Sequence, residues 1–442
     1  MTVVSDADQK TSNSLFWLIL AHCFNMDGRA ASQTITDKLP YLLAEGVVPV
    51  VLSAPTGDKD NRFPHFQVLS TAPSGILFEL RQIIRKRVSH PLPEKFLKAI
   101  LTIIILPFYI FEKIFIHLDS HWSWLISASI KGAFLIKKYR PKMIYTSAGP
   151  TSTHAAGYIL HRLFKIPWLA EIYDPLIYDR DTGHSQRYKF NRWIERSIFR
   201  HADAVIYFTN KALNSAKGRN SERNNLYMLR PGAPFINFPE FGYKKLDKIH
   251  FGHFGSLGDG RDFSIFFKSI HDLIKEHPEW RDKISVDIYG MEIDPVSRRA
   301  LIDYPLNGIL YEHGRLENDP ATGKSGRQQV LEAIRRCDVL LIIHGTDIIC
   351  EEYIPSKIYE YFLTFRPILG LARPDSELRY LLEDNGHTYV DGEDIDKIKM
   401  VIKNFVTRWE SVGLPDQMPK SHYTVEKTVN TLLEIADSIT DR

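Results

Sequence analysis

Apolar runs of strand length alternate with helix-periodic segments in the first part of the chain. An uncharged run at 15–21 is followed by a polar loop and by apolar residues at helical spacing over 30–44. Gly46 ends this pattern, and a second apolar run covers 47–52. Strand, helix and strand in this order predict the start of a parallel α/β sheet, because parallel neighbours need a crossover between them.

The alternation resumes after a long stretch at 76–140, which has a helical pattern and is expected to be an α-helical insertion. Beyond it, strand patterns and helical patterns follow one another at 143–145, 151–164, 167–173, 190–200 and 204–208. We therefore expect an N-terminal Rossmann-like domain over residues 1–235.

A stretch dense in Pro and Gly at 230–239 lies near the middle of the chain and is interpreted as a linker. A second alternating series follows, with strands expected near 249–254, 284–289, 308–312, 338–343 and 367–371. The expected C-terminal Rossmann-like domain covers 236–420, and an amphipathic helix within 421–442 is expected to return to the N-terminal domain. Two such parallel-sheet domains, facing across a cleft, would bind a ligand at the carboxyl ends of their strands.

Composition narrows the class of protein. The 442 residues contain 56 Lys and Arg against 53 Asp and Glu, so the net charge of +3 gives no drive toward nucleic acid. The three cysteines, Cys23, Cys337 and Cys350, have neither zinc-site nor redox-pair spacing. The N-terminal residues lack the basic-then-apolar order of a signal peptide. We therefore expect a cytoplasmic protein.

One segment stands apart from this ordinary composition. Residues 99–111 carry no charge, and 80–98 contain six Lys and Arg against one Glu. The uncharged run is too short for a spanning helix, which needs about 20 apolar residues. Two interpretations stay open for 80–111: peripheral docking on the inner face of an anionic membrane, or a buried apolar helix beside a solvated basic one.

The strongest candidate for chemistry is the pair Glu352 and Glu360. Pro355 stands between them at a favoured first-turn position of a helix. Eight residues of helix span about 12 Å, which suits a nucleotide sugar measured from its ribose to its transferred sugar. The amides of Ser356 and Lys357 at the helix start would suit a diphosphate between these ends. The alternative is that both glutamates are solvated surface residues.

A glycine-rich segment at 251–261 closes the first strand of the C-terminal half. Gly255 would let the backbone approach a phosphate, and Arg261 would supply positive charge. The alternative is a tight turn without a ligand. Two further motifs are weaker: Thr322–Ser325 resembles the end of a P-loop but lacks its first glycine, and His117 with His121 lacks a third metal ligand.

Together these segments resemble the retaining glycosyltransferases of family 4, which have the GT-B fold of two facing Rossmann-like domains. The resemblance covers roughly residues 15–435 and leaves 76–120 poorly matched. It is carried by Gly28-Arg29, 140–150, 254–261 and 354–370.

The resemblance implies roles for these residues. Glu352 would hold hydroxyls of the transferred sugar, Glu360 would bind the ribose, and Arg261 falls where the family commonly has a phosphate-binding lysine. The segment Pro355, Ser356 and Lys357 would hold the diphosphate, and the loop with Gly28 would cover it. Ser256 follows Gly255 where the family usually has arginine, and Ser147 stands where many members have a histidine that contacts the donor sugar.

Asp174 follows the strand 167–173 and is our candidate for a polar group on the acceptor side, with a turn-forming aspartate before Pro175 as the alternative. The expected catalytic residues are therefore Glu352, Arg261 and Asp174. The expected reaction moves a hexosyl group with retention, without metal or cofactor, from a nucleotide-diphosphate sugar to a growing glycan or a lipid-linked acceptor. A nucleotide-sugar epimerase of GT-B fold and a non-catalytic sugar-nucleotide-binding protein remain alternatives.

Overall fold

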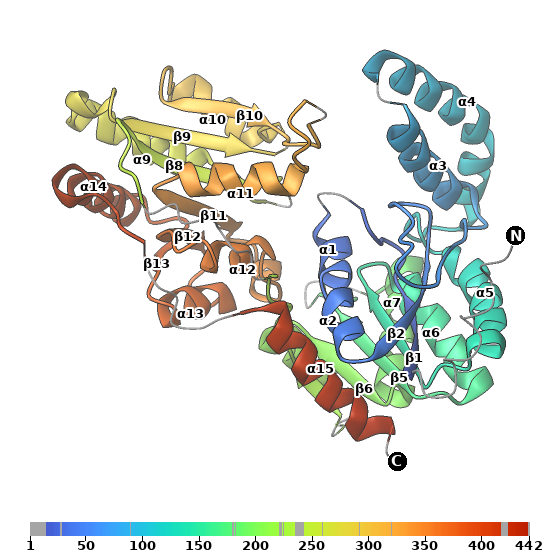
Figure 1. The fold of residues 1–442 in the computed structure, drawn as a ribbon. Helices are drawn as coiled ribbons and strands as arrows, with labels where there is room; N and C mark the ends of the chain where they lie inside the picture. The colour runs from blue at the N-terminus through green and yellow to red at the C-terminus, as the bar shows by residue number, and fades with distance from the viewer. Residues whose placement is uncertain are drawn as a thin grey trace, which may run out of the picture. The chain divides into compact units, whose positions relative to one another are not determined.

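The computed structural model describes residues 15–440 apart from 27–28, 89, 179–180, 182, 221–222, 224, 235–242, 259, 291, 320 and 417–422. The chain forms two compact units. The N-terminal unit comprises Met1–Arg230 together with Val425–Arg442, and the C-terminal unit comprises Pro231–Thr424. Figure 1 shows the elements of both units.

The N-terminal unit is built on a seven-stranded sheet whose paired strands are all parallel, with the order β3-β2-β1-β4-β5-β6-β7. Its strands are β1 (Leu15–Leu20), β2 (Val47–Ser53), β3 (His65–Gln67), β4 (Met143–Ala148), β5 (Trp168–Ile172), β6 (Ala204–Tyr207) and β7 (Leu226–Met228). The helices are α1 (Ala30–Thr36), α2 (Leu39–Ala44), α3 (Pro73–Arg87), α4 (Pro91–Phe115), α5 (Trp124–Tyr139), α6 (Thr151–Phe164), α7 (Gln186–His201), α8 (Asn210–Arg219) and α15 (Val425–Thr440). The strands β3 and β7, which the sequence analysis did not predict, have only three residues each.

The C-terminal unit has a six-stranded parallel sheet with the order β10-β9-β8-β11-β12-β13. Its strands are β8 (Ile249–Phe254), β9 (Ile284–Tyr289), β10 (Leu310–Gly314), β11 (Val339–Gly345), β12 (Ile368–Ala372) and β13 (Thr388–Asp391). The helices are α9 (Ser264–Glu276), η1 (Pro278–Trp280), α10 (Pro295–Asp303), α11 (Gly326–Arg336), η2 (Ile348–Glu351), α12 (Lys357–Phe362), α13 (Glu377–Asp384) and α14 (Ile395–Val412). The prediction of two parallel-sheet α/β domains is confirmed.

The central strands are apolar on both faces because helices cover both. In β1, Trp17 and Ile19 pack into one buried cluster and Leu18 and Leu20 into another. A strand buried on both faces reads as a continuous apolar run, which is why β1 was visible in the sequence. Helix α15 packs against α2 and β6 and adds its apolar face to the first of these clusters, so the C-terminal segment belongs to the N-terminal unit.

Helices α3 and α4 pack on each other and extend from the N-terminal unit beyond its sheet (Figure 1). The interpretation that the uncharged run 99–111 is a buried helix is wrong, because α4 exposes most of its apolar side chains; Ile103, for example, is 70% exposed. None of the described helices meets the length and hydropathy needed to cross a membrane.

Candidate functional site

The candidate donor site lies at the carboxyl ends of β8 and β11 in the C-terminal unit. These strands are parallel neighbours, with Val339 paired to Phe251, so the loops that follow them leave the same edge of the sheet. Gly255 follows β8 with φ +117°, and its amide donates to the carbonyl of Tyr289. This positive φ favours glycine and lets the chain turn sharply where the sequence predicted a phosphate loop.

Lys357 connects the two loops. Its Nζ donates to the carbonyl of Phe254 at 2.7 Å and lies 3.2 Å from Nε2 of His253. Burial, together with the positive charge of Arg261, lowers the pKa of Lys357 to about 7. Burial also holds the pKa of His253 well below its usual value, and Lys357 adds to this effect, so the imidazole is neutral.

Arg261 is the second cation of the site. Its Nε donates to the carbonyl of Gly258 at 2.8 Å, and its guanidinium lies 5.9 Å from the ring centroid of Tyr353. A Cβ added to Gly345 would approach Cγ of Arg261 to 2.9 Å, so this arginine lies against the end of β11. The structure thus brings Arg261, the predicted cation, and the side chain of Lys357, of which only the backbone amide was predicted to act, to one end of the sheet.

His344, on β11, holds the loop that carries Glu352. Its Nε2 lies 2.8 Å from the carbonyl of Cys350 and 3.0 Å from that of Tyr353, and since both partners are acceptors this nitrogen is the donor. Burial lowers the pKa of His344 to about 4, which keeps the ring neutral. Glu352 directly follows the short helix η2 and is only 3% exposed, so it is not a solvated surface residue.

Glu360 lies on α12 and accepts a hydrogen bond at 2.6 Å from Nη2 of Arg327, which lies on α11. The sequence analysis missed Arg327 because nothing in its spacing links it to the glutamate pair. Pro355 and Ser356 precede α12, and their carbonyls accept the amides of Ile358 and Tyr359.

Helix α12 has six residues. Because so short a helix has little dipole, the cations provide most of the positive charge here.

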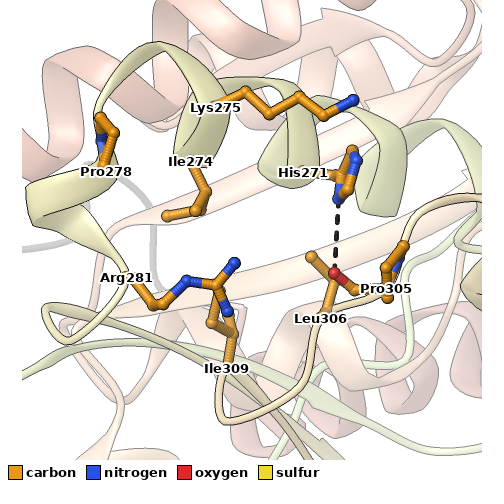
Figure 2. A pocket seen from close by; sticks show the side chains of 8 residues that line it. All are labelled: His271, Ile274, Lys275, Pro278, Arg281, Pro305, Leu306 and Ile309. Carbon is orange, nitrogen blue, oxygen red and sulfur yellow. Dashed lines mark hydrogen bonds between the residues drawn. The ribbon is translucent and has the colours of Figure 1, made fainter.

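Ser256, which stands where the family resemblance would place an arginine, is exposed in the loop after β8. A pocket of about 150 Å³ adjoins this loop and is lined by Gly260, Asp262, Gly345, Thr346 and Glu393, among others. A second pocket, of about 120 Å³, lies beside α9, where His271 is 3.3 Å from the carbonyl of Pro305 (Figure 2). Neither pocket is lined by a predicted site residue, and only the first adjoins the loop that leads to Arg261.

In the N-terminal unit, the predicted residues do not form one cluster. Ser147 is 2% exposed, and its hydroxyl donates at 2.6 Å to Oε2 of Glu171. The carboxylate of Glu171 also accepts hydrogen bonds from the hydroxyl of Tyr145 and from the ammonium of Lys38. Asp174 is exposed two residues beyond the end of β5. Gly28 lies outside the described residues. The roles assigned to these three residues stay predictions.

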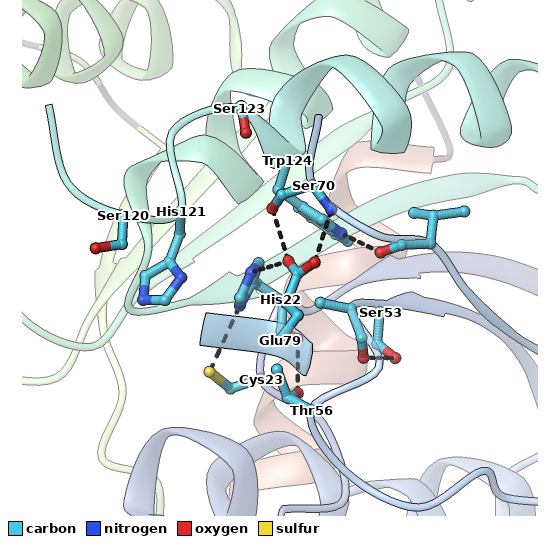
Figure 3. Close-up of polar contacts among 12 residues, drawn as sticks. His22, Cys23, Ser53, Thr56, Ser70, Glu79, Ser120, His121, Ser123 and Trp124 are labelled. Carbon is cyan, nitrogen blue, oxygen red and sulfur yellow. Dashed lines mark hydrogen bonds and ion pairs between the residues drawn. The ribbon is translucent and has the colours of Figure 1, made fainter. Parts of the chain in front are cut away.

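A second buried polar cluster, which the sequence analysis missed, surrounds His22 directly after β1 (Figure 3). Nε2 of His22 lies 3.2 Å from Oε1 of Glu79, and Nδ1 lies 3.6 Å from Sγ of Cys23. Glu79 accepts the amide and the hydroxyl of Ser70 at 2.7 and 2.6 Å. Burial opposes a charge on His22, but the hydrogen bonds with Cys23 and Glu79 outweigh it and raise its pKa to about 9.

His121 lies against His22 with a ring-centroid distance of 4.5 Å. Burial and the charge of His22 lower its pKa to about 3. Within the described part of the chain, no group of three or more His, Cys, Asp or Glu side chains is arranged to hold a metal ion.

Comparison with known proteins bears on the fold and on part of the N-terminal unit. Residues 116–232 match the family described as "Glycosyl transferase 4-like domain". No curated protein sequence matches significantly.

Among solved structures, TarM matches with a TM-score of 0.63 and 9% identity over 98% of this chain and 100% of that one. Alr3699/HepE of Anabaena, solved with UDP, matches with a TM-score of 0.59 and 11% identity over 96% and 100%. The lipopolysaccharide outer core galactosyltransferase WaaB matches with a TM-score of 0.55 and 9% identity over 96% and 99%.

The fold is therefore that of the GT-B glycosyltransferases. Within it, residues 116–232, nearly all of them in the N-terminal unit, form a glycosyl transferase 4-like domain.

Proposed function

We propose that this protein is a retaining, metal-independent glycosyltransferase that moves a hexosyl group from a nucleotide-diphosphate sugar to a growing glycan or a lipid-linked acceptor. One observation carries the proposal: Arg261 and Lys357 meet at the carboxyl edge of β8 and β11, beside the loop with Glu352. The structures solved with UDP, such as HepE, lend support because their fold is the same.

The chemistry follows from the charges. Departure of a nucleoside diphosphate builds negative charge on its phosphate oxygens, and two nearby cations would stabilise that charge as it develops. Lys357 can respond to it, because a phosphate anion beside an amine favours the ammonium form. Glu352 would accept hydrogen bonds from sugar hydroxyls, and Glu360 would accept those of the ribose. We place the reaction on the cytoplasmic face of a membrane, where a lipid-linked acceptor would be presented.

The decisive experiment measures nucleoside-diphosphate release from UDP-, GDP- and ADP-sugars, with and without acceptor glycans. We expect one donor class to turn over, and Arg261→Met and Glu352→Gln to lower kcat/KM by about 100-fold or more, as loss of a transition-state contact does. Glu312→Gln is the matched control, since Glu312 forms an exposed ion pair with Arg298 on another edge of the unit.

The same assay separates the alternatives. An epimerase would convert the donor sugar to its isomer without any acceptor. A non-catalytic binding protein would bind a nucleotide sugar without turning it over. Failure of every donor to bind, or unchanged kinetics in Glu352→Gln and Arg261→Met, would overturn the proposal.

A further inference from the structure

Helix α4 turns its apolar side chains outward, away from the unit it belongs to. Six large ones are each 60–70% exposed: Ile103, Ile104, Phe108, Phe111, Ile114 and Phe115. We call these six residues the apolar face of α4. So large an exposed apolar surface on one helix is unusual for a soluble domain and marks a site of interaction with a protein or a membrane.

The opposite side of α4 packs inward and makes polar contacts beside the partly buried Leu101, Ile105 and Tyr109. Nη2 of Arg81, on α3, donates to Thr102 at 2.8 Å. Further along, buried Glu112 accepts the amide of Ser74 and the indole N–H of Trp122, each at 2.8 Å. A surface helix normally buries its apolar stripe and exposes its polar one. The polar contacts therefore help to fix the orientation of α4, with the apolar face outward.

The length of the apolar run decides how this helix can meet a bilayer. Residues 99–111 are uncharged and extend about 20 Å as a helix, which is shorter than a hydrocarbon core of about 30 Å. Charged residues bound the run on both sides, at Lys98 and Glu112. Such a helix lies along the membrane surface, with its apolar side chains at the boundary between headgroups and acyl chains.

The charges around the apolar face are positive. Helices α3 and α4 contain seven Lys and Arg and three Glu. Two of the glutamates, Glu79 and Glu112, are buried in hydrogen bonds, and the third, Glu94, is paired with Lys98. The exposed surface beside the apolar face is therefore cationic.

A groove between α3 and α4 concentrates three of these cations. It has a volume of about 470 Å³ and is lined by Arg81, Lys95 and Lys98 together with Phe78, Ala99 and Thr102. Cations at the edge of an apolar surface match the arrangement of lipid phosphates above acyl chains. A second copy of the chain fits less well, because its own α3–α4 surface is also cationic and offers no row of anions to these side chains.

We propose that the apolar face of α4 docks on a bilayer rich in anionic phospholipid, with lipid phosphates bound in the α3–α4 groove. Docking involves neither a donor sugar nor any residue of the candidate donor site, so it is independent of the proposed reaction and can fail or succeed separately from it.

Vesicle flotation of the full chain tests the proposal directly. We expect the protein to float with phosphatidylcholine vesicles that contain phosphatidylglycerol, to bind pure phosphatidylcholine at least tenfold more weakly, and to dissociate as salt is raised. The triple variant Ile103→Ser, Phe108→Ser, Phe111→Ser should lose binding by at least tenfold, because it removes apolar area from the acyl boundary.

Matched controls keep the result interpretable. Ile302→Ser with Val412→Ser removes side chains that are 78% and 74% exposed in the C-terminal unit and should bind vesicles as the wild type does. Arg87→Glu with Lys95→Glu should weaken binding to anionic vesicles, whereas Arg408→Glu, on α14, should not. Unchanged circular dichroism and thermal unfolding would show that the variants fold.

Three results would overturn the proposal. The first is no vesicle binding, and the second is binding that the α4 variants leave unchanged. The third is a vesicle-independent dimer, seen by sedimentation velocity, that the triple variant dissociates. The last result would assign the apolar face to a second copy of the chain.

Discussion

Nζ of Lys357 lies 3.2 Å from Nε2 of His253 and donates at 2.7 Å to the carbonyl of the next residue, Phe254. The lysine begins α12 and the histidine lies on β8, so this contact links the two loops of the candidate donor site. Burial and the charge of Arg261 hold the pKa of Lys357 near 7. At neutral pH the group is divided between amine and ammonium, and a bound anion would favour the ammonium.

The first prediction concerns the pH dependence of nucleotide binding. A bound diphosphate raises the pKa of Lys357, so binding takes up a proton above about pH 7. Affinity should therefore be greatest below pH 7 and fall with rising pH, by up to about tenfold per unit, until the pKa of the bound state is passed. Titration calorimetry with the preferred nucleoside diphosphate in buffers of different ionisation heat measures both the affinity and the proton uptake.

Two variants separate Lys357 from the titration of the ligand itself. Lys357→Met should bind more weakly and keep only the pH dependence of the phosphate, whereas Lys357→Arg should retain charge at all these pH values. If Lys357→Met kept the full pH dependence of the wild type, the lysine would not be in contact with the diphosphate.

The second prediction concerns the ribose. If Glu360 accepts ribose hydroxyls, the wild type should prefer the ribonucleoside diphosphate to its 2′,3′-dideoxy analogue by about tenfold or more, because hydrogen bonds to a charged group contribute about 1.5–3 kcal/mol. Glu360→Gln should reduce this preference. Arg327→Gln should reduce it less, since Arg327 orients the carboxylate from 2.6 Å but would not touch the sugar.

Competition binding with the two nucleotides provides the measurement, and Glu312→Gln is again the control because its carboxylate also pairs with an arginine at 2.6 Å. An equal preference for the ribonucleotide in the wild type and in Glu360→Gln would show that Glu360 does not bind the ribose.

The third prediction concerns Gly290, whose backbone lies close to that of Gly255 in the loop after β8. Gly290 has φ +133°, and a Cβ there would lie 2.5 Å from the carbonyl oxygen of Gly255. Gly290→Ala should therefore displace the loop after β8, lower stability by about 1–3 kcal/mol and weaken nucleotide binding.

Gly308→Ala is the control for backbone strain alone, because Gly308 has φ +77° but no atom within 4 Å of an added Cβ. It should lose stability without losing nucleotide affinity. Equal nucleotide affinity in both alanine variants would show that the position of Gly255 does not matter for the donor.

Strong local patterns made the fold predictable. Strands such as β1 and β11 are buried on both faces and therefore appear in the sequence as unbroken apolar runs. The strands β3, β7 and β13 were not expected, since they have three or four residues and, unlike the equally short β6, are only partly buried, so they give no continuous apolar run.

The candidate site was predictable where its residues are close in sequence. Glu352, Lys357 and Glu360 fall in one segment, and Gly255 and Arg261 in another, so motif spacing found them. Arg327 lies 33 positions from Glu360. Only the folded structure brings α11 close enough to α12 for the guanidinium to donate to the carboxylate. Spacing also suggested backbone amides at Lys357, whereas its side chain makes the contact that joins the loops.

The same limit applies to the N-terminal unit. Glu79 is 57 positions from His22. No sequence pattern predicts that α3, in the helical insertion, places a buried carboxylate beside the loop after β1. The sequence analysis considered His121 only with His117 and set that pair aside for want of a third metal ligand; the structure places His121 against His22 instead.

The last prediction concerns stability of the N-terminal unit. The folded state raises the pKa of His22 to about 9, above the ordinary value of 6.5. The charged pair with Glu79 therefore contributes fully below about pH 6.5 and is lost as pH rises through 9, with a change of at most about 3 kcal/mol. Glu79→Gln should destabilise the unit strongly at low pH and less at high pH.

A pH-independent part of the loss should remain, because Glu79 also accepts the amide and hydroxyl of Ser70. Urea unfolding followed by tryptophan fluorescence suits this test, since five of the seven tryptophans lie in the N-terminal unit and Trp124 packs edge-on against His22. Glu45→Gln, at an exposed position after α2, should leave the free energy of unfolding unchanged at each pH. A loss in Glu79→Gln that is the same at pH values below 6.5 and above 9 would mean that His22 is not charged in the folded protein.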